Sequence, residues 1–232
     1  MSAVDIFTAN ILLAKAEAAG ADPERSWPIV AFAPCGPSYR LCTPAIGKFI
    51  FSSNWHAITE AALEKMCEIA APVPCWLNHS ESTDSSFIPR LGAIRIIPKN
   101  PLSSGGRAGD IYALTWDPHM HAVLAVLEAS PEWHELFMAE WLAGDLNQRG
   151  FSMEYFGKSY DWKPNSRARE SYTVFHEIGG LFSVDLADYP AAAGRFLMPG
   201  CEPTYEVQAE ADNRFRENTG ACILWLDDDD KE

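Results

Sequence analysis

The sequence lacks the patterns that would identify a zinc-binding, disulfide-rich or membrane protein at first sight. Its six cysteines include no Cys-x-x-Cys pair and form no compact framework, which argues against a zinc knuckle and a disulfide scaffold. No apolar run approaches the ~20 residues of a membrane span. Asp5 precedes any basic residue, so we expect no secretory signal. These absences favour a soluble protein whose thiols stay reduced in a cytoplasm.

Positive charge is also scarce in this chain. The chain has 18 lysines and arginines and 32 aspartates and glutamates, which gives a formal net charge of −14. Such a chain is repelled by phosphate backbones, so a free-standing nucleic-acid binder is disfavoured and basic protein partners suit it better. At 232 residues, 47% of them hydrophobic, the chain is long enough to bury one core and too short to require two.

Apolar residues recur at helical spacing in several segments. Two of these segments end at a helix breaker, Gly20 in one case and Pro72 in the other. Two further helix starts are predicted where an N-cap residue precedes a proline, at Asp117-Pro118 and at Ser130-Pro131. The predicted helices cover residues 4–19, 56–70, a stretch beginning at Pro118, and a stretch from Pro131 to Gly144 with an aromatic stripe assigned to the core.

Short alternating or apolar runs predict strands between and after these helices. The predicted strands cover residues 48–52, 72–78, 91–97, 111–116, 151–156, 171–176 and 180–186. Three segments predict irregular structure instead. They are the passage 23–47, which carries five prolines and reads as a loop or edge strand, the Gly- and Ser-rich loop 100–110, and the polar, basic loop 158–171.

Three residues are candidates for nucleophilic catalysis. A serine attacks well when a neighbouring base takes its proton and a third group orients that base. Ser152 lies in an alternating strand, His79 ends a buried strand, and Asp185 lies on a later strand, so they are candidates for nucleophile, base and orienting carboxylate. Because these residue types occur in almost every chain, a structural serine and a surface histidine remain the alternative.

Two competing groups of residues are weaker candidates. His119 and His121, with His134 nearby, suggest a metal site, but an i, i+2 pair on a helix points its two imidazoles apart. Cys75 and His79 suggest a cysteine hydrolase, but positions i and i+4 of one strand are too far apart for proton transfer. We therefore expect no metal site and no cofactor.

A family resemblance covers roughly residues 70 to 195. In chain order, its motifs are Pro-Val-Pro-Cys-Trp-Leu-Asn-His79, Leu91-Gly92-Ala93-Ile94, Gly150-Phe151-Ser152-Met153-Glu154-Tyr155, and Leu181 to Asp188 followed by Pro190-Ala191. Ser152 follows His79 by 73 residues, and Asp185 follows Ser152 by 33. This order and spacing resemble the prohead (capsid maturation) proteases of tailed phages, a family related in fold to the herpesvirus assemblin proteases.

The resemblance implies a fold and a set of roles. It implies an α+β chain with a single antiparallel β-barrel-like core surrounded by helices, over residues 56–200. An N-terminal helical and loop extension (1–55) precedes this core, and a C-terminal acidic tail (201–232) follows it. His79 and Ser152 fall on the family's motif positions as base and nucleophile.

The third catalytic position stays open. Counting back from Pro190 places Ser183 where many family members carry a glutamate, and Asp185 lies two residues further on the same strand face. Asp185 is our choice for the third residue, with His176 as a second candidate because assemblins use a histidine there. A Ser-His dyad is the remaining alternative. The loop Ala191–Gly194 is expected to offer a backbone N–H to the oxyanion, or to be a simple turn.

The function implied by the resemblance is a serine endopeptidase. Its substrates or assembly partners would be the scaffolding protein and the major capsid protein, and it would also cleave itself, inside the assembling prohead in the host cytoplasm. No nucleic-acid or membrane partner is expected, and a homo-oligomer is left open. The alternative is a non-enzymatic scaffold or capsid-assembly module on the same fold.

Overall fold

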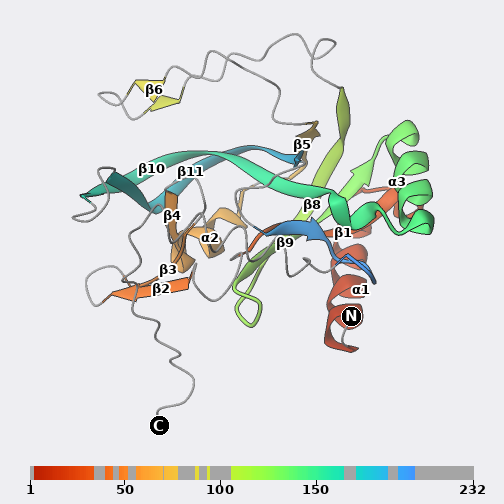
Figure 1. The fold of residues 1–232 in the computed structure, drawn as a ribbon, viewed down its shortest axis with the longest axis horizontal. Helices are drawn as coiled ribbons and strands as arrows, with labels where there is room; N and C mark the ends of the chain where they lie inside the picture. The colour runs from red at the N-terminus through yellow and green to blue at the C-terminus, as the bar shows by residue number, and fades with distance from the viewer. Residues whose placement is uncertain are drawn as a thin grey trace.

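In the computed structural model, the chain is described over residues 3–33, 40–43, 47–51, 56–69, 71–77, 87–88, 93–94, 106–164, 171–187 and 193–201. These residues form a mixed α+β fold built on a curled ten-stranded sheet, with a separate two-stranded pairing of β6 and β7. Helices α1 and α3 lie beside one end of the sheet, and β2 to β4 lie at the other (Figure 1). Among the described residues, no helix has the length and apolar character to cross a membrane.

The helices are α1 (Ala3–Ala18), α2 (Glu60–Met66) and α3 (Pro131–Ala143), with short 3-10 turns η1 (Pro23–Arg25) and η3 (Leu146–Gln148). The strands are β1 (Ser26–Phe32), β2 (Arg40–Thr43), β3 (Gly47–Phe51), β4 (His56–Thr59), β5 (Val73–Trp76), β6 (Phe87–Ile88), β7 (Ala93–Ile94), β8 (Arg107–Asp117), β9 (Ala122–Ala129), β10 (Gly150–Pro164), β11 (Ser171–Ala187) and β12 (Gly194–Phe196).

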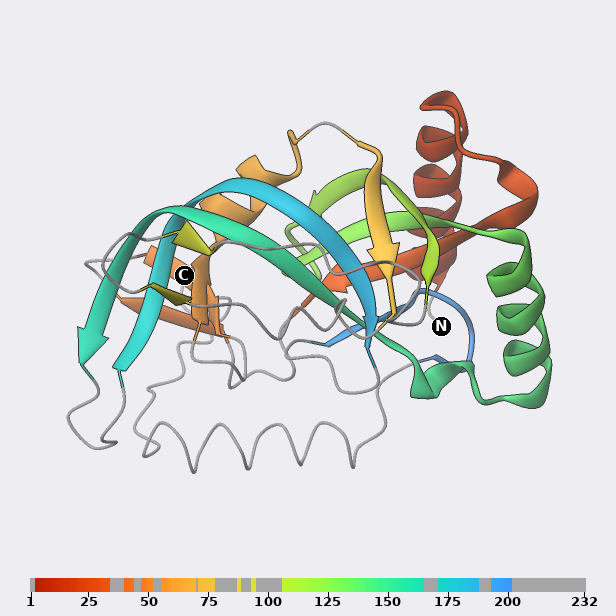
Figure 2. The same ribbon diagram turned by 90° about the horizontal axis from the view of Figure 1, so that it is seen from above.

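The main sheet curls back on itself. Its strand order is β2-β3-β4-β11-β10-β12-β1-β9-β8-β5, so β5 lies at one edge. The chain just after β5 nevertheless returns to β11, because Leu77 forms a parallel bridge with Leu186. The long antiparallel hairpin of β10 and β11 arches across the molecule (Figure 2). The curl therefore places the end of β5 against the C-terminal end of β11.

Apolar side chains on both faces of the sheet form the core. Because successive strand residues point to opposite faces, Ile29 of β1 enters a large cluster while its neighbour Val30 enters a smaller one beneath α1. The large cluster also receives Phe151 and Leu186, and the smaller one receives Leu12 of α1. Strands β1 to β3 come from the segment 1–55, so that segment contributes to the same sheet as residues 56–200.

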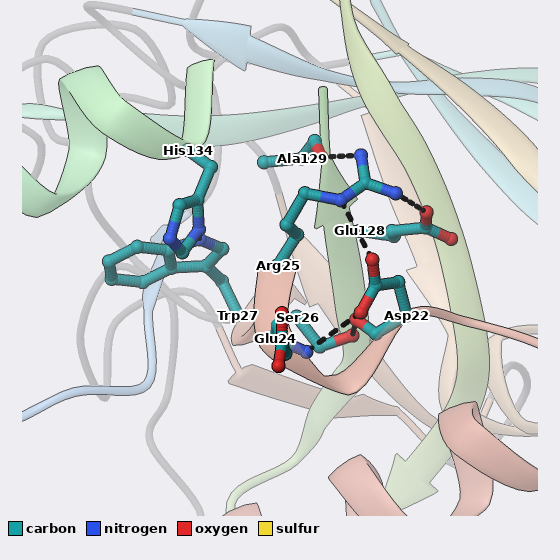
Figure 3. Close-up of polar contacts among 8 residues, drawn as sticks. All are labelled: Asp22, Glu24, Arg25, Ser26, Trp27, Glu128, Ala129 and His134. Carbon is teal, nitrogen blue, oxygen red and sulfur yellow. Dashed lines mark hydrogen bonds and ion pairs between the residues drawn. The ribbon is translucent and has the colours of Figure 1, made fainter. Parts of the chain in front are cut away.

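A polar network fixes the start of β1 (Figure 3). The Arg25 guanidinium donates to the Ala129 carbonyl at 2.9 Å, to Asp22 Oδ2 at 3.0 Å and to Glu128 Oε1 at 2.7 Å. One residue into β1, Trp27 Nε1 donates to His134 Nδ1 of α3 at 3.2 Å. These bonds join η1, β9 and α3 at one point beside the sheet.

Two of the predicted helices are confirmed and two need correction. Helices α1 and α3 form, and Gly144 ends α3 with φ 82. The helix predicted over 56–70 is too long, because β4 takes its first residues and Thr59 caps the shorter α2 by accepting from Ala62 N at 3.2 Å. The helix predicted from Pro118 is wrong. Asp117 Oδ1 accepts from the backbone of His119 and Met120, and this cap closes the turn between β8 and β9.

Several strand predictions are confirmed over the described residues, among them those for β3, β5 and β8. β8 begins earlier than predicted, so the loop predicted over 100–110 is wrong from Arg107 on. The loop or edge strand predicted over 23–47 is wrong for β1, which is an interior strand of the sheet between β12 and β9. The loop predicted over 158–171 is wrong for residues 158–164, which form the end of β10. The two strands predicted around Gly179 and Gly180 are one strand, β11, whose register shifts near these glycines.

A strained alanine in β8 gives a test of this backbone. Ala113 has φ 55 at a bulge opposite β9, a conformation that costs a non-glycine residue roughly 1–2 kcal/mol. We expect Ala113→Gly to raise the free energy of unfolding by about 0.5–1 kcal/mol in urea denaturation, since glycine's entropy cost offsets part of the relieved strain. Ala125→Gly, in the regular part of β9, should lower it by a similar amount. Destabilisation by both substitutions would contradict the bulge.

Candidate functional site

Ser152 and Asp185 lie directly opposite each other in the β10–β11 ladder. Their neighbours Phe151 and Leu186 point to the other face, into the large apolar cluster. Opposite residues of an antiparallel pair have Cβ atoms about 4.5–5.5 Å apart, so the two polar side chains share one face at close range. Ser152 is 9% exposed and Asp185 is fully buried. The structure therefore brings the predicted nucleophile and the predicted orienting carboxylate together.

The Asp185 carboxylate accepts hydrogen bonds on both oxygens. Oδ1 accepts from the backbone N–H of Trp76 at 2.9 Å, and Oδ2 accepts from the Ser183 hydroxyl at 2.8 Å. A buried carboxylate is costly unless it is hydrogen-bonded, and bonds to an ionised acceptor are among the stronger ones. These two donors stabilise a carboxylate in the protein interior and fix its orientation.

The end of β5 meets β11 at the same place. Trp76 donates to Asp185, and the next residue, Leu77, forms its bridge with Leu186. His79 follows in the sequence and lies outside the described residues. The strand predicted to deliver the base thus ends beside the predicted orienting carboxylate.

Cys75 is placed poorly for a nucleophile. Its side chain is fully buried. Burial, with a further contribution from the nearby Asp185 carboxylate, raises the pKa of the Cys75 thiol well above its ordinary value. Because the thiolate is the reactive form, this environment suits an inert structural cysteine.

His176, the second candidate for the third residue, is not brought to Ser152. It lies nine positions before Asp185 on β11, which corresponds to roughly 30 Å along an extended strand. Asp185, not His176, is the partner of Ser152 across the ladder. The geometry therefore favours Asp185 for the third role.

Two further polar residues share the site. Sequence reasoning assigned no role to Glu154, and it marked Ser183 only as the position where the resembled family often carries a glutamate. Glu154 and Ser183 form the next pair on the same face of the ladder, and the Ser183 hydroxyl lies 3.3 Å from Glu154 Oε2. Strand periodicity places Ser152 with Glu154, and Ser183 with Asp185. The pairing of the two strands was the missing information, since it sets all four side chains side by side.

The loop expected to bind the oxyanion is described only at its end. Residues 191–192 lie outside the described part, and the Ala193 N–H donates to the Ala33 carbonyl at 3.0 Å. Gly194 belongs to β12 and pairs with Phe151, next to Ser152. A Cβ at Gly194 would collide with the Phe151 carbonyl, so glycine allows β12 to approach β10 here.

Two of the three histidines considered for a metal site have other partners. His121 Nδ1 lies 2.6 Å from Glu60 Oε1, and His134 accepts from Trp27. His119 is exposed in the turn after β8. Within the part of the chain that the structure describes, no three His, Cys, Asp or Glu side chains gather as a metal site would require.

A half-buried His–Tyr pair joins β4 to the β10–β11 hairpin. His56 Nδ1 of β4 is 3.0 Å from the Tyr155 hydroxyl, and the Phe175 ring packs against both side chains. Burial lowers the pKa of His56 and raises the pKa of the Tyr155 phenol. The pair is therefore neutral near pH 7, and it links β4 to the β10–β11 hairpin.

His56 should make the stability depend on pH. Its pKa is lower in the folded chain, so the unfolded chain binds the proton first and stability falls as pH drops below about 6.5. The slope from this group is at most about 1.4 kcal/mol per pH unit. We expect His56→Gln to flatten the slope of stability against pH in urea denaturation between pH 7 and 5. An unaltered slope in His56→Gln would rule out this role.

Comparisons of the chain with protein-family models, with curated proteins and with solved structures find no match. Three features of the site bear on its function. They are the Ser152–Asp185 pair, the two donors to Asp185, and the end of β5 beside them.

Proposed function

We propose that this chain is a serine endopeptidase that cleaves scaffolding and capsid-associated proteins, and itself, during phage prohead maturation. Ser152 would be the nucleophile, His79 the base and Asp185 the orienting carboxylate. The observation that carries the proposal is the position of Ser152 directly opposite Asp185, whose carboxylate accepts from the end of β5. The sequence resemblance supplies the family and the class of substrate.

Chain connectivity supports His79 as the base. Leu77 is bridged to Leu186, next to Asp185, and His79 follows Leu77 by two residues. Two residues span at most about 7 Å, and an imidazole adds several ångströms of reach. This reach would let a histidine at position 79 serve the face that holds Ser152 and Asp185, as the proposal requires.

The proposed reaction is acyl transfer in two halves. Ser152 Oγ attacks the peptide carbonyl as its proton passes to His79, and the imidazolium is stabilised by the Asp185 carboxylate. His79 then returns the proton to the leaving amine, and an acyl-enzyme remains. Water attacks this ester with His79 again as base, which releases the new carboxyl end and restores Ser152.

The fold and the charge are compatible with the proposed setting. A curled, mainly antiparallel sheet flanked by helices is the architecture expected of a herpesvirus-protease-like core. The net charge of −14 favours basic protein partners such as shell or scaffold segments. The proposed location is the host cytoplasm, inside the assembling prohead, with scaffolding and major capsid proteins as substrates or partners.

Covalent labelling tests the nucleophile. A fluorophosphonate probe acylates an activated serine, so we expect the parent protein to be labelled and Ser152→Ala to lose at least about 100-fold of the labelling rate. Intact-mass spectrometry measures the single adduct. Ser130→Ala is the matched control, because Ser130 lies at the start of α3 and its hydroxyl donates to Glu132. Equal labelling of the parent and Ser152→Ala would exclude Ser152 as the nucleophile.

Processing of a co-expressed scaffold tests the base and the third residue. We expect His79→Ala and Asp185→Asn each to slow cleavage by roughly 10²–10⁴-fold, because general-base catalysis is lost or weakened. His119→Ala and His176→Ala should cleave at the parent rate, and gel densitometry follows all four. Normal cleavage by His79→Ala would refute the assignment of the base. A folded parent protein that neither cleaves nor reacts with the probe would favour the assembly-module alternative.

A further inference from the structure

Ser183 occupies a central place in the polar face of the β10–β11 hairpin. It is 2% exposed and lies two residues before Asp185 on β11, so the two side chains point to the same face. Its hydroxyl donates to Asp185 Oδ2 at 2.8 Å and lies 3.3 Å from Glu154 Oε2 across the ladder. A neutral residue thus stands between two carboxylates in a largely buried site.

A serine hydroxyl has one proton, so it donates to one carboxylate at a time. The contact to Asp185 has the length of a good O–H···O bond, whereas the contact to Glu154 is beyond that range. The Ser183 hydroxyl therefore donates its hydrogen bond mainly to the Asp185 carboxylate. The Glu154 carboxylate is the natural comparison, because it touches the same hydroxyl from the other strand.

The two donors to Asp185 act on different oxygens. The Trp76 N–H is a backbone donor from β5 and holds Oδ1, while Ser183 is a side-chain donor from β11 and holds Oδ2. Together they fix the rotation of the carboxylate about its Cβ–Cγ bond. In a catalytic triad, the orientation of the base follows from the orientation of this carboxylate, as it does for metal-bound histidines held by a carboxylate.

We propose that Ser183 is a positioning residue for the reaction, whose hydroxyl holds the Asp185 carboxylate in the orientation that serves His79. This inference rests on the proposed function and deepens it. In this role Ser183 acts only through the Asp185 carboxylate, to which its hydroxyl donates. Its effect should therefore pass through Asp185 and disappear when Asp185 is absent.

A double-mutant cycle on the fluorophosphonate acylation rate tests the inference. The variants are Ser183→Ala, Ser183→Thr, Asp185→Ala, Glu154→Gln, and Ser183→Ala combined with each of the last two. Saturation kinetics separate probe binding from the acylation step. Thermal melting checks that each variant folds, and Asp185→Leu, which also removes the acceptor of the Ser183 hydroxyl, replaces Asp185→Ala if the latter does not.

We expect Ser183→Ala to slow the acylation step about tenfold at unchanged probe affinity, the usual scale for one hydrogen bond to a charged group. Ser183→Thr, which keeps the hydroxyl, should stay within about threefold of the parent. Ser183→Ala should have less than a twofold effect in the Asp185→Ala background and its full effect in the Glu154→Gln background.

The failures of the two proposals are distinguishable. If the folded parent protein is not labelled at all, the proposed function fails and the role of Ser183 with it. If the parent is labelled but Ser183→Ala has the same effect with and without Asp185, the role of Ser183 alone is overturned. A threonine variant as slow as the alanine variant, or an effect that vanishes in Glu154→Gln, would also overturn it.

Discussion

The antiparallel pairing of β10 with β11 holds both the main sheet and the candidate site together. β11 joins β10 on one side, and on the other it receives β4 and the end of β5. Because strand side chains alternate, a slip of one residue would turn Ser152 toward the core and Phe151 outward. The apolar residues that alternate with the polar ones therefore fix both the register and the site.

A buried carboxylate at this pairing gives the site its chemical character. Asp185 is fully buried, and donors from two strands hold it, so its position is defined by the fold and not by a mobile loop. The bond from Trp76 also ties the curl of the sheet to the site, since it forms where β5 returns to β11. The return of β5 to β11 and the orientation of the Asp185 carboxylate therefore depend on the same contacts.

Signals from neighbouring residues correctly predicted the elements whose form depends mainly on their own sequence. The helix ending at Gly144 and the alternation around Ser152 are examples. Predictions failed where long-range pairing overrides a local signal: Asp117 caps a turn instead of a helix, and Gly179-Gly180 lies within one long strand. The site shows the same limit. Alternation gave the face of each strand, but the contact between Ser183 and Asp185, and the approach of Trp76, depend on how distant segments meet.

The distance from the His79 imidazole to Ser152 Oγ, in a crystal structure of the protein with an acylating inhibitor bound, tests the proposed catalytic triad most directly. We expect one imidazole nitrogen within about 2.6–3.2 Å of Ser152 Oγ, and the other facing the Asp185 carboxylate. An imidazole directed away from both groups, with the inhibitor attached to a different residue, would contradict it.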